Sequence, residues 1–162
     1  GNTVPVTVTI SDAKTAIGDN ESLITYSLGS CIGVSLYDPT RKVAGLLHFQ
    51  LPTSTMDAQR AAQNPCMFAD SGFAQLLAMM AAHGADKKRL KCKIAGGAKM
   101  LVDNSSFDIG KRNHTAIRKV LWQHGILCDS EDCGGNQPRT MTVLCKDGTV
   151  TLKRGGELVA MK

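Results

Sequence analysis

The chain has 162 residues and a net charge of +5, and 43% of its residues are hydrophobic while 20% are charged. This length is typical of one domain, and the proportions exclude a mainly disordered or fibrous chain. The basic excess comes without a nucleic-acid reading motif or stacking aromatics, so nucleic-acid binding is not expected. A solvated basic face that attracts an acidic protein partner is the simpler interpretation.

Neither a membrane span nor a metal site is expected. The longest uncharged stretch covers residues 22–37, and it is shorter than the ~20 apolar residues that a bilayer requires. The N-terminal segment alternates in polarity and does not resemble a signal peptide, which favours a cytoplasmic location. Six cysteines occur without a C-x-x-C pair or a histidine at zinc-finger spacing, so they are expected to be reduced.

The first part of the chain predicts strands. Residues 4–10 alternate between apolar and polar side chains, and Pro5 favours an edge position for this strand. Three further strands are predicted at residues 23–28, 32–37 and 43–49. The last two are joined by a four-residue turn over residues 38–41, where Asp followed by Pro is typical of a type I turn.

The second part of the chain predicts two main helices at residues 70–83 and 111–124, which end at Gly84 and Gly125. Strands are predicted at residues 90–95 and 126–132, followed by a closing hairpin at residues 140–145 and 149–153. We therefore expect one α+β domain over residues 1–162. Its predicted architecture is a layered α/β/α type with a mixed, largely antiparallel sheet and two main helices.

The predicted hairpin brings a cysteine and a histidine together. If residues 38–41 form the turn, Cys31 lies directly opposite His48, with Cβ atoms about 4.5–5.5 Å apart. A histidine at that distance can accept the thiol proton and generate the nucleophilic thiolate. The alternative is a buried strand cysteine and a core histidine, because a one-residue slip would separate the two side chains.

The residues around Cys31 predict a bend with exposed backbone groups. Gly29 and Ser30 precede the cysteine and Gly33 follows it, in a G-x-C-x-G pattern. A nucleophile elbow requires a helix after this motif, whereas a strand is predicted here. The backbone N–H groups of Ser30 and Cys31 are candidates for stabilising an oxyanion, and small Gly33 is expected to leave open space above the sulfur.

Several motifs, in family order, resemble the CheD family of chemoreceptor glutamine deamidases. They are TYSLGSC (25–31), DP (38–39), HFQLP (48–52), KIAGGA (93–98), IGKRN (109–113), EDCGGN (131–136), RT (139–140) and KRG (153–155). The resemblance implies a nucleophile at Cys31, a base at His48 and an orienting threonine at Thr25. It also implies a fold similar to that of toxin domains that deamidate glutamine.

The resemblance further implies that selected glutamines of a chemoreceptor are converted to glutamates through a thioester, without a metal or cofactor. The implied partners are the cytoplasmic helical bundle of the receptor and a CheC-type phosphatase. Two alternatives stay open: a binding module that acts mainly on the phosphatase, and a receptor glutamyl methylesterase that uses the same thiol. Five residues are expected either to line the cleft or to form ordinary turns: Gly96, Gly97, Gly134, Gly135 and Asn136.

Overall fold

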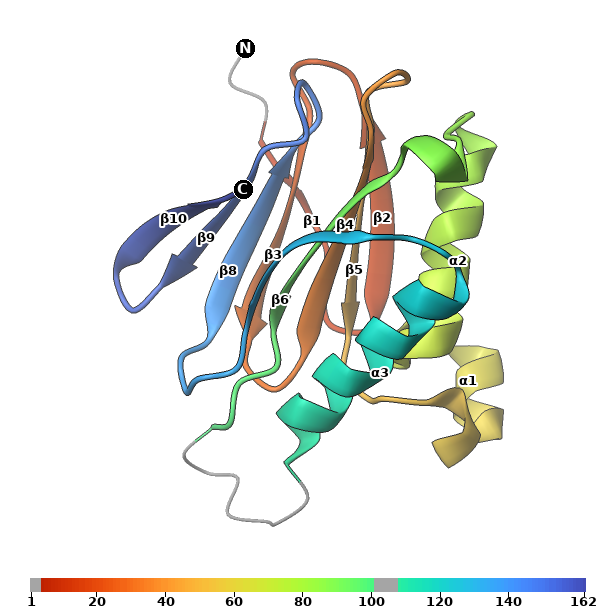
Figure 1. Cartoon of the computed structure of the whole chain (residues 1–162), viewed down its shortest axis with the longest axis vertical. Coiled ribbons are helices and arrows are strands. Elements are labelled where there is room, and N and C mark those ends of the chain that lie inside the picture. The colour runs from red at the N-terminus through yellow and green to blue at the C-terminus, as the bar shows by residue number, and fades with distance from the viewer. Residues whose placement is uncertain (1–3, 101–107) are drawn as a thin grey trace.

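The computed structural model describes residues 4–100 and 108–162 and arranges the strands in two sheets (Figure 1). Sheet A has the order β1-β3-β8-β9-β10, with strands Val6–Thr7, Ser22–Leu28, Arg139–Leu144, Val150–Arg154 and Glu157–Met161. Sheet B has the order β2-β5-β4-β6-β7, with strands Asp12–Ile17, Val43–Phe49, Ile32–Asp38, Lys91–Gly96 and Cys128–Cys133. The β1–β3 and β6–β7 pairs are parallel, and the other described pairs are antiparallel.

The sheets stack on each other, and the two long helices cover the outer face of sheet B (Figure 1). The helices are α1 (Ala58–Gln63), α2 (Ala69–Ala82) and α3 (Ile109–Gln123), with single 3₁₀ turns at Ser54–Met56, Pro65–Met67 and Lys87–Arg89. One core cluster joins α2 and α3 to sheet B, and a second fills the space between the sheets. Helices and sheets thus bury their apolar faces in two separate layers.

The predicted α+β class, with mixed, largely antiparallel strands and two main helices, is confirmed. The layer order is different, because it is sheet, sheet and helix rather than α/β/α. Strands β4 and β5 are buried along their whole length on both faces. Burial of both faces requires two covering layers, but the strand sequence does not reveal whether a helix or a second sheet covers each one.

Most predicted elements match the structure to within about two residues, the usual uncertainty at element ends. Strand β1 is at the edge of sheet A, as Pro5 indicated, but covers only Val6–Thr7. Three elements were missed: β2, α1 and β10. Helices α2 and α3 end as predicted, with Gly84 at φ +83° and Gly125 at φ +67° in the left-handed conformation that glycine favours.

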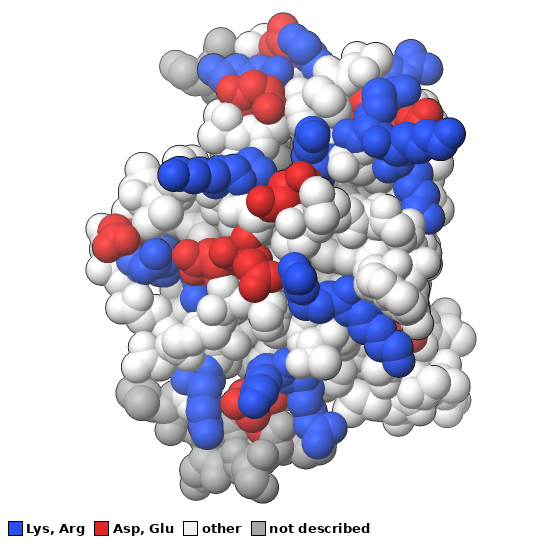
Figure 2. All heavy atoms as spheres, in the orientation of Figure 1, with Lys and Arg blue, Asp and Glu red and all other residues white. Residues whose placement is uncertain are grey.

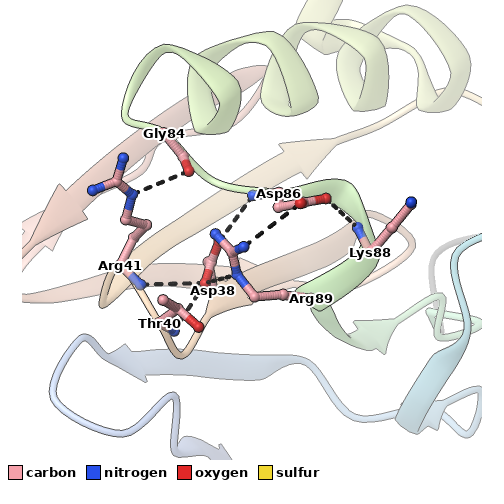
Figure 3. Close-up of polar contacts among 7 residues, drawn as sticks. All are labelled: Asp38, Thr40, Arg41, Gly84, Asp86, Lys88 and Arg89. Atoms are coloured by element: carbon pink, nitrogen blue, oxygen red, sulfur yellow. Dashed lines mark hydrogen bonds and ion pairs between the residues drawn. The ribbon is translucent and has the colours of Figure 1, made fainter.

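The turn between β4 and β5 is organised by a buried carboxylate, Asp38 (Figure 3). Its Oδ1 accepts the backbone N–H groups of Thr40 at 2.9 Å and Arg41 at 3.2 Å. Its Oδ2 accepts the backbone N–H of Asp86 at 2.9 Å and Nη2 of Arg89 at 2.8 Å. Burial by itself raises the pKa of Asp38, but Arg89 and these N–H groups outweigh it and lower the pKa to about 2.

This turn corrects the predicted register. Asp38 pairs with Val43, so the loop consists of residues 39–42 and Ile32 faces Phe49. The predicted turn began one residue earlier, which displaced every pair by two positions. A two-residue displacement keeps each side chain on its face. Ile32, Val34 and Leu36 therefore share one face, and they belong to the core cluster that α2 and α3 cover.

No helix in the described ranges is long and apolar enough to cross a membrane.

Candidate active site

The candidate site lies between the sheets, where the chain passes from sheet A to sheet B. Thr25 lies on β3 of sheet A, His48 on β5 of sheet B, and Cys31 directly before β4. All three side chains are buried, with exposed fractions of 0% for Thr25, 3% for His48 and 9% for Cys31. The fold thus brings the three predicted catalytic residues to one region of the inter-sheet core.

The predicted direct pairing of Cys31 with His48 is wrong, because His48 faces Gly33. Cys31 lies one residue before the last pair of this ladder, Ile32 with Phe49, and alternation places its side chain on the same face of the hairpin as Gly33 and His48. Gly33 does not open a space above the sulfur: a Cβ there would meet Met141 Sδ at 2.8 Å and Leu28 Cδ1 at 3.0 Å.

Thr25 fixes the tautomer of His48. The Thr25 Oγ1 donates its hydrogen to the carbonyl oxygen of Val8 at 2.7 Å, and it also lies 2.7 Å from Nδ1 of His48. A hydroxyl has one hydrogen, so the second contact has to be an Nδ1–H donating to Oγ1. The other ring nitrogen, Nε2, then carries a lone pair, and it is buried without a hydrogen-bond partner among the described residues. His48 is therefore oriented with its basic nitrogen unused.

Burial keeps both reactive groups neutral. It raises the pKa of the Cys31 thiol to about 11, an effect that the backbone N–H of the same residue partly offsets. It also lowers the pKa of the His48 imidazole to about 4. Desolvation disfavours the charged form in each case. At neutral pH these pKa values favour the thiol form of Cys31 and the neutral imidazole form of His48.

The loops around Cys31 approach its backbone closely. Gly97 N–H donates to the Cys31 carbonyl oxygen at 2.9 Å, and Ala98 N–H donates to that of Gly29 at 2.8 Å. Gly96 has φ +118°, and a Cβ there would overlap the Cys31 carbonyl oxygen. Only glycine fits this position. Gly96 and Gly97 therefore hold the cysteine segment, while Gly97 also lines a cavity of about 220 Å³.

The loop of Gly134, Gly135 and Asn136 lies one layer farther from Cys31. The Gly134 N–H donates to the Gly96 carbonyl oxygen at 2.9 Å. All three residues line a polar cavity of about 430 Å³. The buried Arg139 and Asp132 also line this cavity and pair with each other at 3.0 Å. This loop supports the glycines that contact Cys31, and among the described residues it makes no backbone hydrogen bond to the cysteine itself.

A basic groove runs between the first half of α3 and the segment after β5. It has a volume of about 770 Å³, and its lining includes Pro52, Thr53, Met56, Lys99, Asp108, Lys111, Arg112, Thr115, Ala116 and Lys119. Figure 2 shows basic side chains over α3 and, separately, over the loop between α2 and β6. Four cations and one carboxylate in the groove favour a negatively charged partner.

One buried polar residue next to the site was missed by the sequence analysis. Asn113 lies on the core-facing side of α3, whose other buried residues are Gly110, Ile117, Val120 and Leu121. An amide in an otherwise apolar stripe is a signal for a specific hydrogen-bonding role, since buried polar groups are costly without partners.

Within residues 4–100 and 108–162, no group of three or more His, Cys, Asp or Glu is placed to hold a metal ion.

Comparisons with known proteins agree with the motif resemblance. The family model described as CheD chemotactic sensory transduction matches residues 50–154. A probable chemoreceptor glutamine deamidase CheD of Solibacter usitatus is 42% identical over 94% of this chain and 90% of its own. That of Clostridium novyi is 44% identical over 93% of each chain. The YfiH hypothetical protein of Bacillus licheniformis superposes on 77% of this chain and 50% of its own, with a TM-score of 0.45 and 13% identity.

Proposed function

Because the chain belongs to the CheD family, as its motifs indicated, we propose that it deamidates glutamine side chains of chemoreceptors to glutamates. Cys31 is the nucleophile, His48 the general base and acid, and Thr25 the residue that orients the imidazole. The observation that carries this assignment is the Thr25–His48 hydrogen bond of 2.7 Å, which leaves Nε2 as a free base.

The first half-reaction forms a thioester. Cys31 Sγ attacks the side-chain carbonyl carbon of glutamine while the thiol proton passes to Nε2 of His48, because an imidazole accepts the proton that burial keeps on sulfur. The carbonyl oxygen becomes an oxyanion. When this intermediate collapses, the carbon–nitrogen bond breaks, Nε2 returns the proton to nitrogen, and ammonia leaves.

The second half-reaction is hydrolysis of the thioester. His48 Nε2 takes a proton from water as the oxygen attacks the thioester carbon. The carbon–sulfur bond then breaks, sulfur regains a proton from Nε2, and glutamate is released. The balance is one water consumed and one ammonia formed, and each proton passes through the same nitrogen.

The backbone N–H groups of Ser30 and Cys31 are the proposed oxyanion donors. In the described part of the chain, neither group donates to a backbone carbonyl. Donors fixed in a buried site stabilise a developing negative charge more strongly than water does, because they need no reorientation. Gly97 and Ala98 support this segment from behind through the Cys31 and Gly29 carbonyl oxygens.

The basic groove is the proposed docking surface for the receptor's helical bundle. It begins at Pro52, four residues after His48, and follows the exposed side of α3. An acidic helix lying there would place its side chains next to the cysteine segment. Opposite charges raise the encounter rate and fix the orientation of the partner more than they raise the affinity.

Mass spectrometry of a receptor cytoplasmic fragment tests the proposal. Incubation with the wild-type protein should convert specific glutamines to glutamates, and Cys31→Ala and His48→Ala should abolish the conversion. A fragment whose glutamates are methylated tests the methylesterase alternative in the same assay. Conversion that survives in Cys31→Ala would exclude the thiol mechanism.

The burial of Cys31, with an exposed fraction of 9%, favours one alternative role. A domain with a covered nucleophile can act mainly by binding, and the proposed partner is a CheC-type phosphatase. Cells that carry Cys31→Ala distinguish the two roles. Retained chemotaxis supports the binding role, whereas its loss together with retained phosphatase binding supports catalysis.

A further inference from the structure

Helix α3 contributes a buried amide next to the proposed catalytic pair. Asn113 is 0% exposed and belongs to the stripe with which α3 packs on sheet B. Its Nδ2 donates to the carbonyl oxygen of Ser30 at 2.9 Å and to that of Gln50 at 3.0 Å. Both neighbours are hydrogen-bond acceptors, so the NH₂ group of the amide faces them. It donates one hydrogen to each carbonyl oxygen.

The two carbonyls belong to the segments that carry the nucleophile and the base. Ser30 directly precedes Cys31, and Gln50 follows His48 by two residues. The main-chain ladder between β4 and β5 ends at the pair of Ile32 and Phe49. Beyond that pair the main chains bond elsewhere, because Gln50 N–H donates to Met67 and the Cys31 carbonyl accepts from Gly97.

We infer that Asn113 is a positioning residue that sets the separation between Cys31 and His48. Its amide joins the diverging ends of the two strands just beyond the pair of Ile32 and Phe49, and so replaces the missing rung of the ladder. The inference rests on the proposed function, since the separation matters only if Nε2 takes the thiol proton. A small error in the distance between the two reacting groups strongly lowers the rate of proton transfer.

The unused end of the amide supports a functional reason for this residue. Oδ1 of Asn113 is buried and has no hydrogen-bond partner in the described structure. An unpartnered buried acceptor destabilises the fold. If this position served packing alone, an apolar residue would be expected, such as Ile117 one turn farther along the same buried stripe.

Alkylation of Cys31 by iodoacetamide tests the inference without a receptor. The peptide that contains Cys31 is followed by mass spectrometry, because five other cysteines are present. In the wild-type protein, His48 should assist the reaction by accepting the thiol proton. The alkylation rate of Cys31 should therefore be independent of pH around neutrality, which gives a plateau. Asn113→Asp keeps the shape of the side chain but removes both N–H donors. In this variant the alkylation rate constant at neutral pH should fall about 10- to 100-fold, towards the value for His48→Ala.

A double variant separates positioning from a general structural effect. If Asn113 acts by positioning Cys31 relative to His48, Asn113→Asp should not lower the alkylation rate further in a His48→Ala background. The effects of interacting sites are not additive. Leu121→Ala, a buried truncation two turns along α3, is the matched control and should leave the plateau unchanged. Additive losses, or an equal loss in Leu121→Ala, would overturn the inference.

Two further results keep the outcomes distinct. If Asn113→Asp does not fold, Asn113→Ala takes its place, with cooperative thermal unfolding as the criterion. Coupled alkylation without any deamidation would disprove the proposed function and leave the positioning role intact. Deamidation with an unchanged kcat in a folded Asn113 variant would disprove the positioning role alone.

Discussion

Thr25 and His48 belong to different sheets, yet Oγ1 of the threonine lies 2.7 Å from Nδ1 of the histidine. The threonine hydrogen is directed to the Val8 carbonyl, which makes Oγ1 an acceptor for the imidazole N–H. In the proposed mechanism, the hydroxyl therefore acts through the tautomer of His48. It is neutral, so it stabilises an imidazolium less than a carboxylate would.

Replacing Thr25 by Val tests this relationship, because the shape is nearly kept and the hydroxyl is lost. We expect kcat for receptor deamidation to fall about tenfold, compared with about 100- to 10,000-fold for His48→Ala. KM should change little. Thr25→Ser retains the hydroxyl and is the control. Equal losses in the Ser and Val variants would contradict an orienting role.

The pH dependence of activity follows from the two buried groups. The pKa of His48 is lowered to about 4, so its Nε2 stays unprotonated above that pH. The pKa of the Cys31 thiol is raised to about 11, so the thiol retains its proton below that pH. We expect kcat/KM to be constant from about pH 5 to about pH 9 and to fall below it as His48 protonates. A fall that begins near pH 6.5, the ordinary pKa of histidine, would show that the site is hydrated during turnover.

Asp38 makes stability depend on pH in a defined window. Its folded-state pKa of about 2 lies below the ordinary value of 3.8, so ionised Asp38 stabilises the fold above about pH 4 and loses this effect as the pH falls towards 2. Asp38→Asn should reduce the free energy of unfolding at pH 7 by about 2 kcal/mol, measured with urea. The difference from wild type should shrink below pH 4.

Asp19→Asn is the control for that measurement. Asp19 binds Lys42 at 2.7 Å, but both side chains are about half exposed or more. Exposed ion pairs contribute about 0–1 kcal/mol, so this variant should be close to wild type. A loss in Asp19→Asn as large as that in Asp38→Asn would mean that burial of Asp38 is not the cause.

Charge reversal in the basic groove should affect binding of the receptor and not the chemistry. The variant Lys111→Glu/Lys119→Glu is expected to raise KM for a receptor fragment about tenfold at low salt, with kcat unchanged. Added salt should reduce the difference. Lys87→Glu/Lys88→Glu, in the loop between α2 and β6, makes the same change of charge outside the groove. Equal effects of the two double variants would exclude the groove as the docking surface.

The sequence was sufficient for the side-chain faces of β4 and β5, because alternation alone determines them. It was insufficient for their register, which depends on the carboxylate of Asp38 bonding the N–H groups inside the loop. Strand β2 was missed because Ala13 is its one buried residue, and its pairing with β5 provides the ordering.

The candidate site was predictable in its side chains but not in its main-chain partners. The motifs predicted Cys31, His48 and Thr25 as its side chains. The Val8 carbonyl that fixes the tautomer, and the Ser30 and Gln50 carbonyls that bind Asn113, have no side-chain signature. The filled space above Gly33 depends on Met141, 108 positions along the chain, which no local pattern reveals.

The placement of Thr25 on one sheet and His48 on the other makes the tautomer a property of the sandwich as a whole. Separation of the sheets by a few ångströms would free the imidazole to rotate while each ladder stayed intact. On warming, activity should therefore be lost at a lower temperature than the one at which circular dichroism records a loss of strands. The temperature dependence of turnover would then report on the contact between the two sheets.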